Sequence, residues 1–345
     1  MERRTLALPA KIESLQSLRF LGAMCITVYH FGGLSGCPFD FSRAVYLFYM
    51  ISGFVVMLST RQPEKKKLFL TRRLIRTLPL YWGLTVFTFA AGSLWPGLIG
   101  YRPTAEQLIK SLLFIPYGRV TAKGGSAIRP IVGLGHTLQM EMLFYVLFLI
   151  AMRLSHKYRG VLAAGFAAAV ALIGRLVPAK GPALHFYTNN AYVWASFILG
   201  LGLYGVFILI DKKELRIRSP LPVSISASLA AVALAVPAFL EARSVWYCIL
   251  IYAAVLSAAL LWSACGLKSP GLTVRLGNIS YSYYLLHYYT VTFAAGFLNI
   301  DSIGWKTVPA ALAISAVTWG ISWVSWYLIE NKTAAFLQKR ICVPR

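Results

Sequence analysis

Arg19 and His30 are the residues best suited to do chemistry, because both lie in the first long apolar stretch, SLRFLGAMCITVYHF. An ionisable side chain inside hydrocarbon costs free energy and is a functional-site candidate by default. Eleven residues of α-helix amount to three turns plus about 20° and a rise of about 16 Å. The spacing therefore predicts that a fixed cation and a titratable imidazole share one helix face and one interior channel.

His30 has the ordinary properties of a general base. An imidazole with a pKa near 6.5 at the deep end of a polar cavity can remove the proton of an attacking hydroxyl group. A structural hydrogen bond near the outer membrane surface is the alternative, and Arg19 on the same face favours the catalytic interpretation.

Glu141 is the one carboxylate deep in an apolar run, GHTLQMEMLFYVLF. A buried, unpaired carboxylate would be destabilising, so we expect a partner such as Arg19, His30 or His136. The carboxylates of Glu13 and Glu330 lie at span ends, where we expect contact with solvent.

Arg73 and Arg76 stand in the basic segment KKKLFLTRRLIRTLPLYW. Three residues apart, they would share a helix face, and guanidinium groups bind phosphates in a bidentate way that Lys does not. Pro79 suits a first helical turn, which would put the arginines at or just before a helix N-terminus. The segment predicts a site for a phosphorylated cytoplasmic ligand.

Polar side chains also interrupt a later span, LGNISYSYYLLHYYT. His287 in this segment fits a structural hydrogen bond and a substrate contact equally well. The five cysteines show no paired or metal-ligand spacing, so we expect neither disulfides nor a bound metal.

The composition identifies the protein class. The 345 residues are 58% hydrophobic and 13% charged, and the mean hydropathy is +0.65, which is typical of an integral membrane protein. We expect an all-α polytopic bundle of about ten transmembrane helices and a short or re-entrant segment near 107–116. The whole chain, 1–345, is expected to be a single membrane domain without an appended soluble domain. The expected spans are 15–33, 41–60, 77–95, 136–154, 160–177, 190–210, 221–240, 244–264, 275–297 and 307–329.

The basic residues support this topology. With ten spans, 23 of the 34 Lys and Arg residues fall on the side of the two termini, and 10 on the opposite side, with Arg19 inside the first span. The positive-inside rule then predicts that both termini are cytoplasmic. The net charge of +23 is dispersed over short loops, which predicts contact with anionic membrane lipid rather than nucleic acid.

Six segments in order resemble the acyltransferase 3 family of bacterial membrane enzymes, and they cover most of the chain. The matching segments are SLRFLGAMCITVYH, FYMISGFVV, RRLIRTLPLYW, TLQMEMLFY, LGNISYSYYLLH and YLIENK. Within the family, GLGHTLQMEMLFY and the lack of a hydrolase-like domain are most similar to exopolysaccharide-type O-acetyltransferases.

The resemblance implies roles for particular residues. Arg19 and His30 match the essential pair, Arg73 and Arg76 match the arginines associated with coenzyme A, and Glu141 matches the acid of the pattern W-S/T-L-x-x-E-x-x-F-Y. His136 stands where the family usually has Trp, which affects local packing and acceptor selection. Further candidates for lining the substrate path are Ser52, Tyr81, His136, Tyr284 and His287.

The expected function is transfer of an acetyl or other acyl group from cytoplasmic acetyl-CoA to a hydroxyl of an extracytoplasmic or lipid-linked saccharide, in the bacterial inner membrane. Direct transfer and an acetyl-histidine intermediate both remain open. The distance of about 16 Å makes Arg19 a better donor-side ligand than a partner of His30. A transporter or flippase for an anionic or glycan substrate is the alternative, although no internal repeat is evident.

Overall fold

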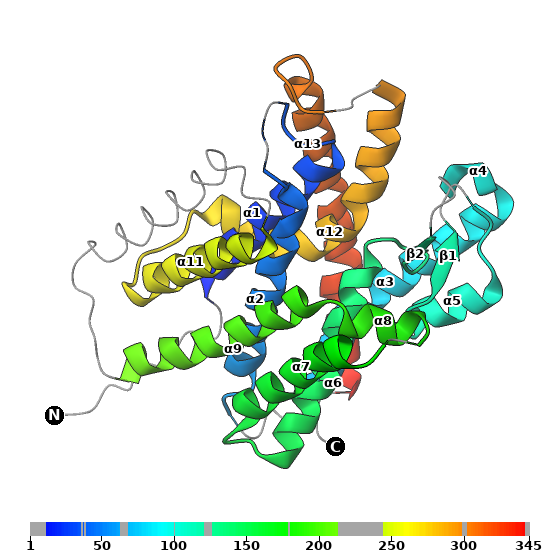
Figure 1. Ribbon diagram of the computed structural model, residues 1–345. Helices are drawn as coiled ribbons and strands as arrows, with labels where there is room; N and C mark the ends of the chain where they lie inside the picture. Colours follow the sequence, from blue (N-terminus) through cyan, green and yellow to red (C-terminus); the bar gives the residue numbers. More distant parts are fainter. Residues whose placement is uncertain are drawn as a thin grey trace.

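The computed structural model describes residues 12–35, 37, 39–62, 68–99, 101–120, 126–178, 180–212, 244–298 and 302–341. These ranges are almost entirely helical, which confirms the predicted all-α class (Figure 1). The longer helices are α1 (Glu13–His30), α2 (Val45–Ser59), α3 (Phe69–Leu94), α6 (Gly135–Leu154), α7 (Arg159–Leu176), α9 (Ala191–Lys212), α11 (Val245–Ala264), α12 (Gly271–Leu298) and α13 (Val308–Ser325).

Seven segments in the described ranges are long and apolar enough to cross a membrane, and each coincides with an expected span. The expected spans at 15–33 and 275–297 form the long helices α1 and α12, which carry more polar residues. The expected span at 221–240 lies outside the described residues. The segments are Phe41–Ser59, Phe69–Leu94, Gly135–Leu154, Arg159–Leu176, Ala191–Ile208, Val245–Ala264 and Val308–Ile341.

Helices α1, α12 and α13 lie side by side and form one part of the bundle (Figure 1). The α1 and α12 backbones approach closely at Gly277, where an added Cβ would stand 1.9 Å from the Gln16 carbonyl oxygen. Hydroxyl groups join the helices inside the apolar interior. Thr27 donates to the Tyr283 hydroxyl at 3.0 Å, and Ser14 donates to the Ala259 carbonyl of α11 at 2.7 Å.

Helices α2 and α9 form a second close pair, and α9 also packs against α7. Gly53 of α2 faces the Phe197 carbonyl, and Gly200 of α9 faces the Met50 carbonyl, so each glycine lets the opposite backbone approach. Phe197 then stacks on Phe144 of α6 with a ring centroid distance of 4.0 Å. This buried apolar layer fixes α6 relative to α2.

Helix α3 begins earlier than the sequence indicated. It starts at Phe69, so Arg73 and Arg76 lie within its second and third turns and Pro79 lies in its interior. The prediction of a helix start near Pro79 was wrong, because the basic segment that precedes the apolar run is itself helical from Phe69 onward. Pro79 leaves backbone groups without the usual helical partner. Near this point the Thr77 hydroxyl donates to the Arg73 carbonyl, and the Tyr281 hydroxyl donates to the Thr77 carbonyl.

The long interval between α3 and α6 forms a compact outer segment. The short helix expected near 107–116 is α5 (Ala105–Leu112), which begins with a Thr104–Gln107 capping box. The glycine-rich stretch forms an antiparallel hairpin of β1 (Gly118–Val120) and β2 (Ser126–Ile128). The remaining short elements are α4 (Pro96–Ile99), α8 (Pro182–Thr188), a 3₁₀ turn at Phe41–Ala44, a π-helical segment at Trp326–Thr333 and α14 (Ala334–Ile341).

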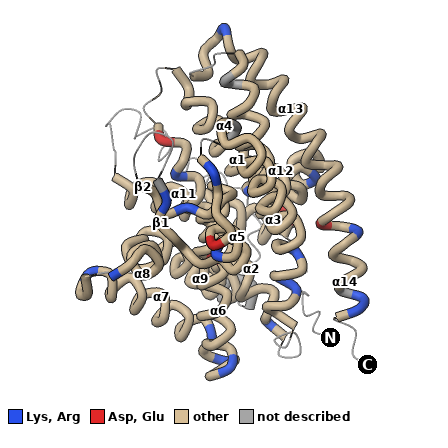
Figure 2. Tube along the Cα trace, turned by 90° about the vertical axis from the view of Figure 1, so that its right-hand side faces the viewer, with Lys and Arg blue, Asp and Glu red and all other residues tan. Residues whose placement is uncertain are grey.

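Charged side chains lie mainly at helix ends. Figure 2 shows Lys and Arg at the ends of α6 and α14, where the last turns carry Arg153 and the pair Lys339 and Arg340. Arg159 has a structural role, since its buried guanidinium donates to the Thr60 hydroxyl and to the His156 and Met57 carbonyls. It thereby ties the start of α7 to the end of α2.

Replacing Gly200 with Ala should destabilise the bundle, because the new Cβ would stand 2.1 Å from the Met50 carbonyl oxygen. Overpacking of this kind costs about 1–3 kcal/mol. Gly202 on the same helix is the matched control, since its added Cβ meets no atom within 4 Å. Thermal unfolding of the purified variants in detergent should show a lower Tm for G200A and an unchanged or higher Tm for G202A. Equal Tm values would contradict the close packing of α2 and α9.

Candidate active site

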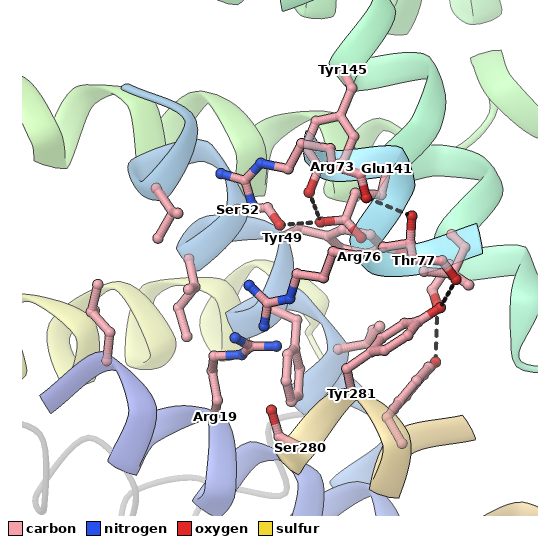
Figure 3. Close-up of a pocket in the computed structure, with 18 of the residues that line it drawn as sticks. Arg19, Tyr49, Ser52, Arg73, Arg76, Thr77, Glu141, Tyr145, Ser280 and Tyr281 are labelled. Atoms are coloured by element: carbon pink, nitrogen blue, oxygen red, sulfur yellow. Dashed lines mark hydrogen bonds between the residues drawn. The ribbon is translucent and has the colours of Figure 1, made fainter. Parts of the chain in front are cut away.

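An inner cavity of about 150 Å³ lies where α1, α2, α3, α6 and α12 meet (Figure 3). It contains four charged side chains in an otherwise apolar and hydroxyl-bearing lining. The polar side chains that line it are Gln16, Arg19, Tyr49, Ser52, Arg73, Arg76, Thr77, Thr137, Glu141, Tyr145, Ser280, Tyr281 and Tyr284.

Three guanidinium groups face this cavity. Arg73 is held in place, because it donates to the Ser59 hydroxyl at 3.3 Å and lies over the Tyr145 ring at 5.4 Å. Arg19 and Arg76 point toward each other (Figure 3), and within the described residues neither has an ion pair or a hydrogen bond. Two like charges in this arrangement repel each other, so the cavity favours an anionic ligand.

Glu141 has different partners from those that the sequence suggested. Its carboxylate accepts hydrogen bonds from the Ser52 and Tyr145 hydroxyl groups, rather than from Arg19, His30 or His136. The Tyr145 contact follows from the helix, because residues four apart lie on one face of α6. Glu141 therefore balances part of the cavity's positive charge without forming an ion pair.

Glu330 also belongs to this region, although the sequence suggested a solvated position at a span end. The side chain is half-buried and accepts a hydrogen bond from the Ser282 hydroxyl of α12. It is close enough to Arg19 and Arg76 to act on both electrostatically. Glu330 stands in the π-helical segment Trp326–Thr333, and π-helical turns occur frequently at functional sites.

A second, outer cavity of about 800 Å³ lies at the other end of α1 and contains His30. Arg19 and His30 thus share one helix but open into different cavities. The polar side chains around the outer cavity are His30, Thr88, Tyr101, Arg119, Arg129, Tyr288, Tyr289, Thr290 and Thr292.

The ring of His30 lies within an aromatic cluster. Its centroid is 5.1 Å from that of His287 and 5.3 Å from that of Tyr288. His287 is fully buried, and its Nδ1 lies 3.1 Å from the Tyr283 carbonyl. A carbonyl oxygen only accepts, so Nδ1 must carry the hydrogen. The Nε2 of His287 is then an unprotonated acceptor, and it has no partner among the described residues.

The other candidate residues lie between the two cavities or beside them. Tyr284 lines the inner cavity and is hydrogen-bonded to Thr137 at 3.1 Å. His136 directly precedes Thr137 in α6, and its Nδ1 lies 2.9 Å from the carbonyl of Gly133, a residue that lines the outer cavity. Tyr81 is not among the residues that line either cavity, because it is fully buried and donates to the Ser111 carbonyl. No group of three His, Cys, Asp or Glu side chains is arranged for a metal in the described ranges.

Two hydrogen-bonding groups that line the cavities were not among the residues expected to form the site. Ser280 is fully buried, lines the inner cavity and leaves its hydroxyl without a partner among the described residues. Arg119 projects from the outer hairpin into the outer cavity. No motif in the sequence marked this side chain.

The comparison with known families agrees with this geometry. The family profile described as an acyltransferase domain matches residues 12–327, which is nearly the whole chain. The chain belongs to the acyltransferase 3 family. The match includes all the described residues that line the two cavities, so this membrane protein is an acyltransferase. The family assignment therefore favours the enzyme over the transporter alternative.

Two relatives are similar along most of their length. One is the exopolysaccharide production protein ExoZ of Rhizobium meliloti (strain 1021), which is 28% identical over 308 residues, covering 86% of this chain and 91% of the relative. The other is the acyltransferase MdmB of Streptomyces mycarofaciens, which is 28% identical over 339 residues, covering 87% of this chain and 82% of the relative. No solved structure matches the chain significantly.

The environment of Glu141 predicts a difference between two substitutions. Gln at this position keeps an oxygen that accepts from Ser52 and Tyr145, whereas Leu leaves both hydroxyl groups without their acceptor. A buried donor without a partner costs about 1–3 kcal/mol. E141L should therefore unfold at a lower temperature than E141Q, measured by thermal unfolding in detergent. Both variants lose the negative charge, so equal Tm values would argue against the two hydrogen bonds.

Proposed function

We propose that the protein transfers an acetyl group from cytoplasmic acetyl-CoA to a hydroxyl group of an extracytoplasmic or lipid-linked saccharide. The observation that carries this proposal is the inner cavity, where Arg19 and Arg76 have no ion-pair partner in the described part of the chain. Phosphate groups of coenzyme A provide such a partner, because guanidinium groups bind phosphate bidentately. At about 150 Å³ the cavity would hold only a part of the donor, so the adenosine would lie outside it while phosphate groups contact the arginines.

In the proposed reaction His30 acts as the base. Its imidazole nitrogen takes the proton of the acceptor hydroxyl while that oxygen attacks the thioester carbonyl carbon. The carbon–sulfur bond breaks, the ester forms, and the imidazolium returns the proton to the departing thiolate. An acetyl-histidine intermediate would divide the same transfer into two steps, with His30 as the nucleophile.

The remaining candidates have positions that suit the two ends of this reaction. Arg19 is proposed as a donor-side ligand with Arg73 and Arg76, since all three line the same cavity. Glu141 holds the hydroxyl groups of Ser52 and Tyr145 beside the donor. His287 is proposed to orient His30, because its unprotonated Nε2 belongs to a ring 5.1 Å away.

The acceptor class is supported by a relative and by the topology. The name of ExoZ refers to exopolysaccharide production, which suits a saccharide acceptor for this chain. The distribution of Lys and Arg favours cytoplasmic termini in a bacterial inner membrane, and it puts Arg73 and Arg76 on the cytoplasmic side. The donor and the acceptor would then reach the single membrane domain from opposite sides.

Replacing His30 with Ala should abolish transfer without unfolding the protein or preventing donor binding. General-base catalysis contributes about 10²–10⁴-fold, so the rate should fall by at least 100-fold. The measurement is incorporation of labelled acetyl groups into the saccharides of cells that express each variant. The control is H185A, because His185 is exposed on α8. Retained acetylation in the H30A variant would exclude His30 as the base or nucleophile.

Replacing Arg73 and Arg76 together with Ala should weaken coenzyme A binding. Each charged hydrogen bond contributes about 1.5–3 kcal/mol, so the Kd should rise by about 100-fold or more. Calorimetric titration of the purified protein with coenzyme A would measure this change. R153A is the control, because Arg153 is exposed at the end of α6 and lines neither cavity. An unchanged Kd would remove the two arginines from the donor site.

A further inference from the structure

The outer cavity has an excess of positive charge. Arg119 and Arg129 line it together with His30, and its lining residues in the described part of the chain include no Asp or Glu. A neutral sugar would be bound by hydroxyl and amide groups and would require neither guanidinium. The two arginines therefore need an explanation beyond general saccharide binding.

Arg119 is fixed in place before any ligand binds. Its backbone is paired with Ala127 in the hairpin, and its guanidinium lies 4.5 Å from the centroid of the Tyr101 ring. The Nε and Nη1 atoms are nevertheless buried, and the nearby Tyr101 hydroxyl does not have the geometry of a standard hydrogen bond to them. Buried guanidinium nitrogens without acceptors are costly, and a carboxylate or phosphate oxygen would satisfy them.

Arg129 connects this charge to the proposed reaction centre. It follows β2 directly, its side chain is exposed, and it is close enough to His30 and His136 to act on both electrostatically. An anion held by Arg119 and Arg129 would therefore lie next to the imidazole that takes the hydroxyl proton. The negative group of such an acceptor would position a neighbouring hydroxyl for attack.

We infer that the outer cavity recognises an acceptor that carries a negative charge, and that Arg119 and Arg129 bind this anion. The anion is a phosphate of a lipid carrier or a carboxylate of a sugar acid. This inference rests on the proposed function, since it defines the class of saccharide that reaches His30. The lining of the cavity also includes Phe87 of α3 and Phe293 of α12, which are 65% and 74% exposed. These exposed aromatic residues suit an acceptor with a lipid chain.

The test uses two anionic probes on the purified full-length protein. Inorganic pyrophosphate represents the carrier phosphate, methyl glucuronide represents the sugar acid, and methyl glucoside is the neutral control. Saturating coenzyme A is present throughout, because pyrophosphate would otherwise also bind near Arg73 and Arg76. Calorimetry gives the Kd of each probe for the wild type, R119A, R129A and R175A. Arg175 is the matched control, because it is exposed in the last turn of α7 and does not line the cavity.

We expect at least one anionic probe to bind, methyl glucoside not to bind, and R119A and R129A each to weaken binding by about tenfold to hundredfold. R175A should leave the Kd unchanged. Binding of pyrophosphate alone would identify a carrier phosphate, and binding of methyl glucuronide alone would identify a sugar acid. The inference is overturned if neither anion binds, or if both arginine variants bind like the wild type.

Two features of the experiment keep the result interpretable. R129A removes an exposed side chain, so it remains informative if R119A does not fold. Coenzyme A binding is measured separately for every variant. A loss of anion recognition with intact coenzyme A binding concerns only the acceptor inference, whereas a wild-type protein that fails to bind coenzyme A contradicts the proposed function itself.

Discussion

Positive charge enclosed by an apolar bundle is the constraint on which the rest of this structure depends. Arg19, Arg73 and Arg76 surround one cavity, and the nearby described carboxylates, Glu141 and Glu330, are bound to hydroxyl groups rather than to guanidinium groups. Removing an ion from water costs several kcal/mol unless it is paired. The folded protein therefore has an unmet electrostatic requirement, and an anionic ligand that satisfies it would also stabilise the arrangement of helices.

Close backbone contacts hold these charges at fixed positions. Gly277 lets α12 approach α1, and Gly53 and Gly200 bring α2 and α9 together. In a membrane, small residues at such crossings let helices associate through van der Waals contact and hydrogen bonding. These close helix crossings lie beside the cavities. Helix–helix contacts at the crossings take the place of contacts with lipid, and they also orient the polar side chains of α1, α2 and α12 toward the interior.

Much of the helical architecture could be predicted from hydropathy, whereas the arrangement of the side chains in the site could be seen only in the tertiary structure. Long apolar runs gave nearly all the described helices, and the cost of burying an ion identified Arg19, His30 and Glu141 as candidates. Three features were not predictable from these signals. The basic residues that precede the apolar run do not show where α3 begins. The π-helical turn around Glu330 could not be predicted from local sequence, and the hairpin that carries Arg119 contains no periodic motif. Each depends on contacts between distant segments, such as Ser282 with Glu330.

The side chains between the two cavities affect how well the protein prevents ion leakage across the membrane. Thr137 and Tyr284 are joined by a hydrogen bond there, and His287 is fully buried. A continuous aqueous path between two cavities rich in arginine and histidine would leak ions down the membrane potential, which is worth about 2.3 kcal/mol per elementary charge at 100 mV. Thr137 and Tyr284 line the inner cavity. The ring of His287 lies 5.8 Å from that of Tyr284 and 5.1 Å from that of His30 in the outer cavity, so protein side chains lie between the two cavities. Packing between the two cavities would thus make the bundle an electrical insulator, although each cavity is lined by charged side chains.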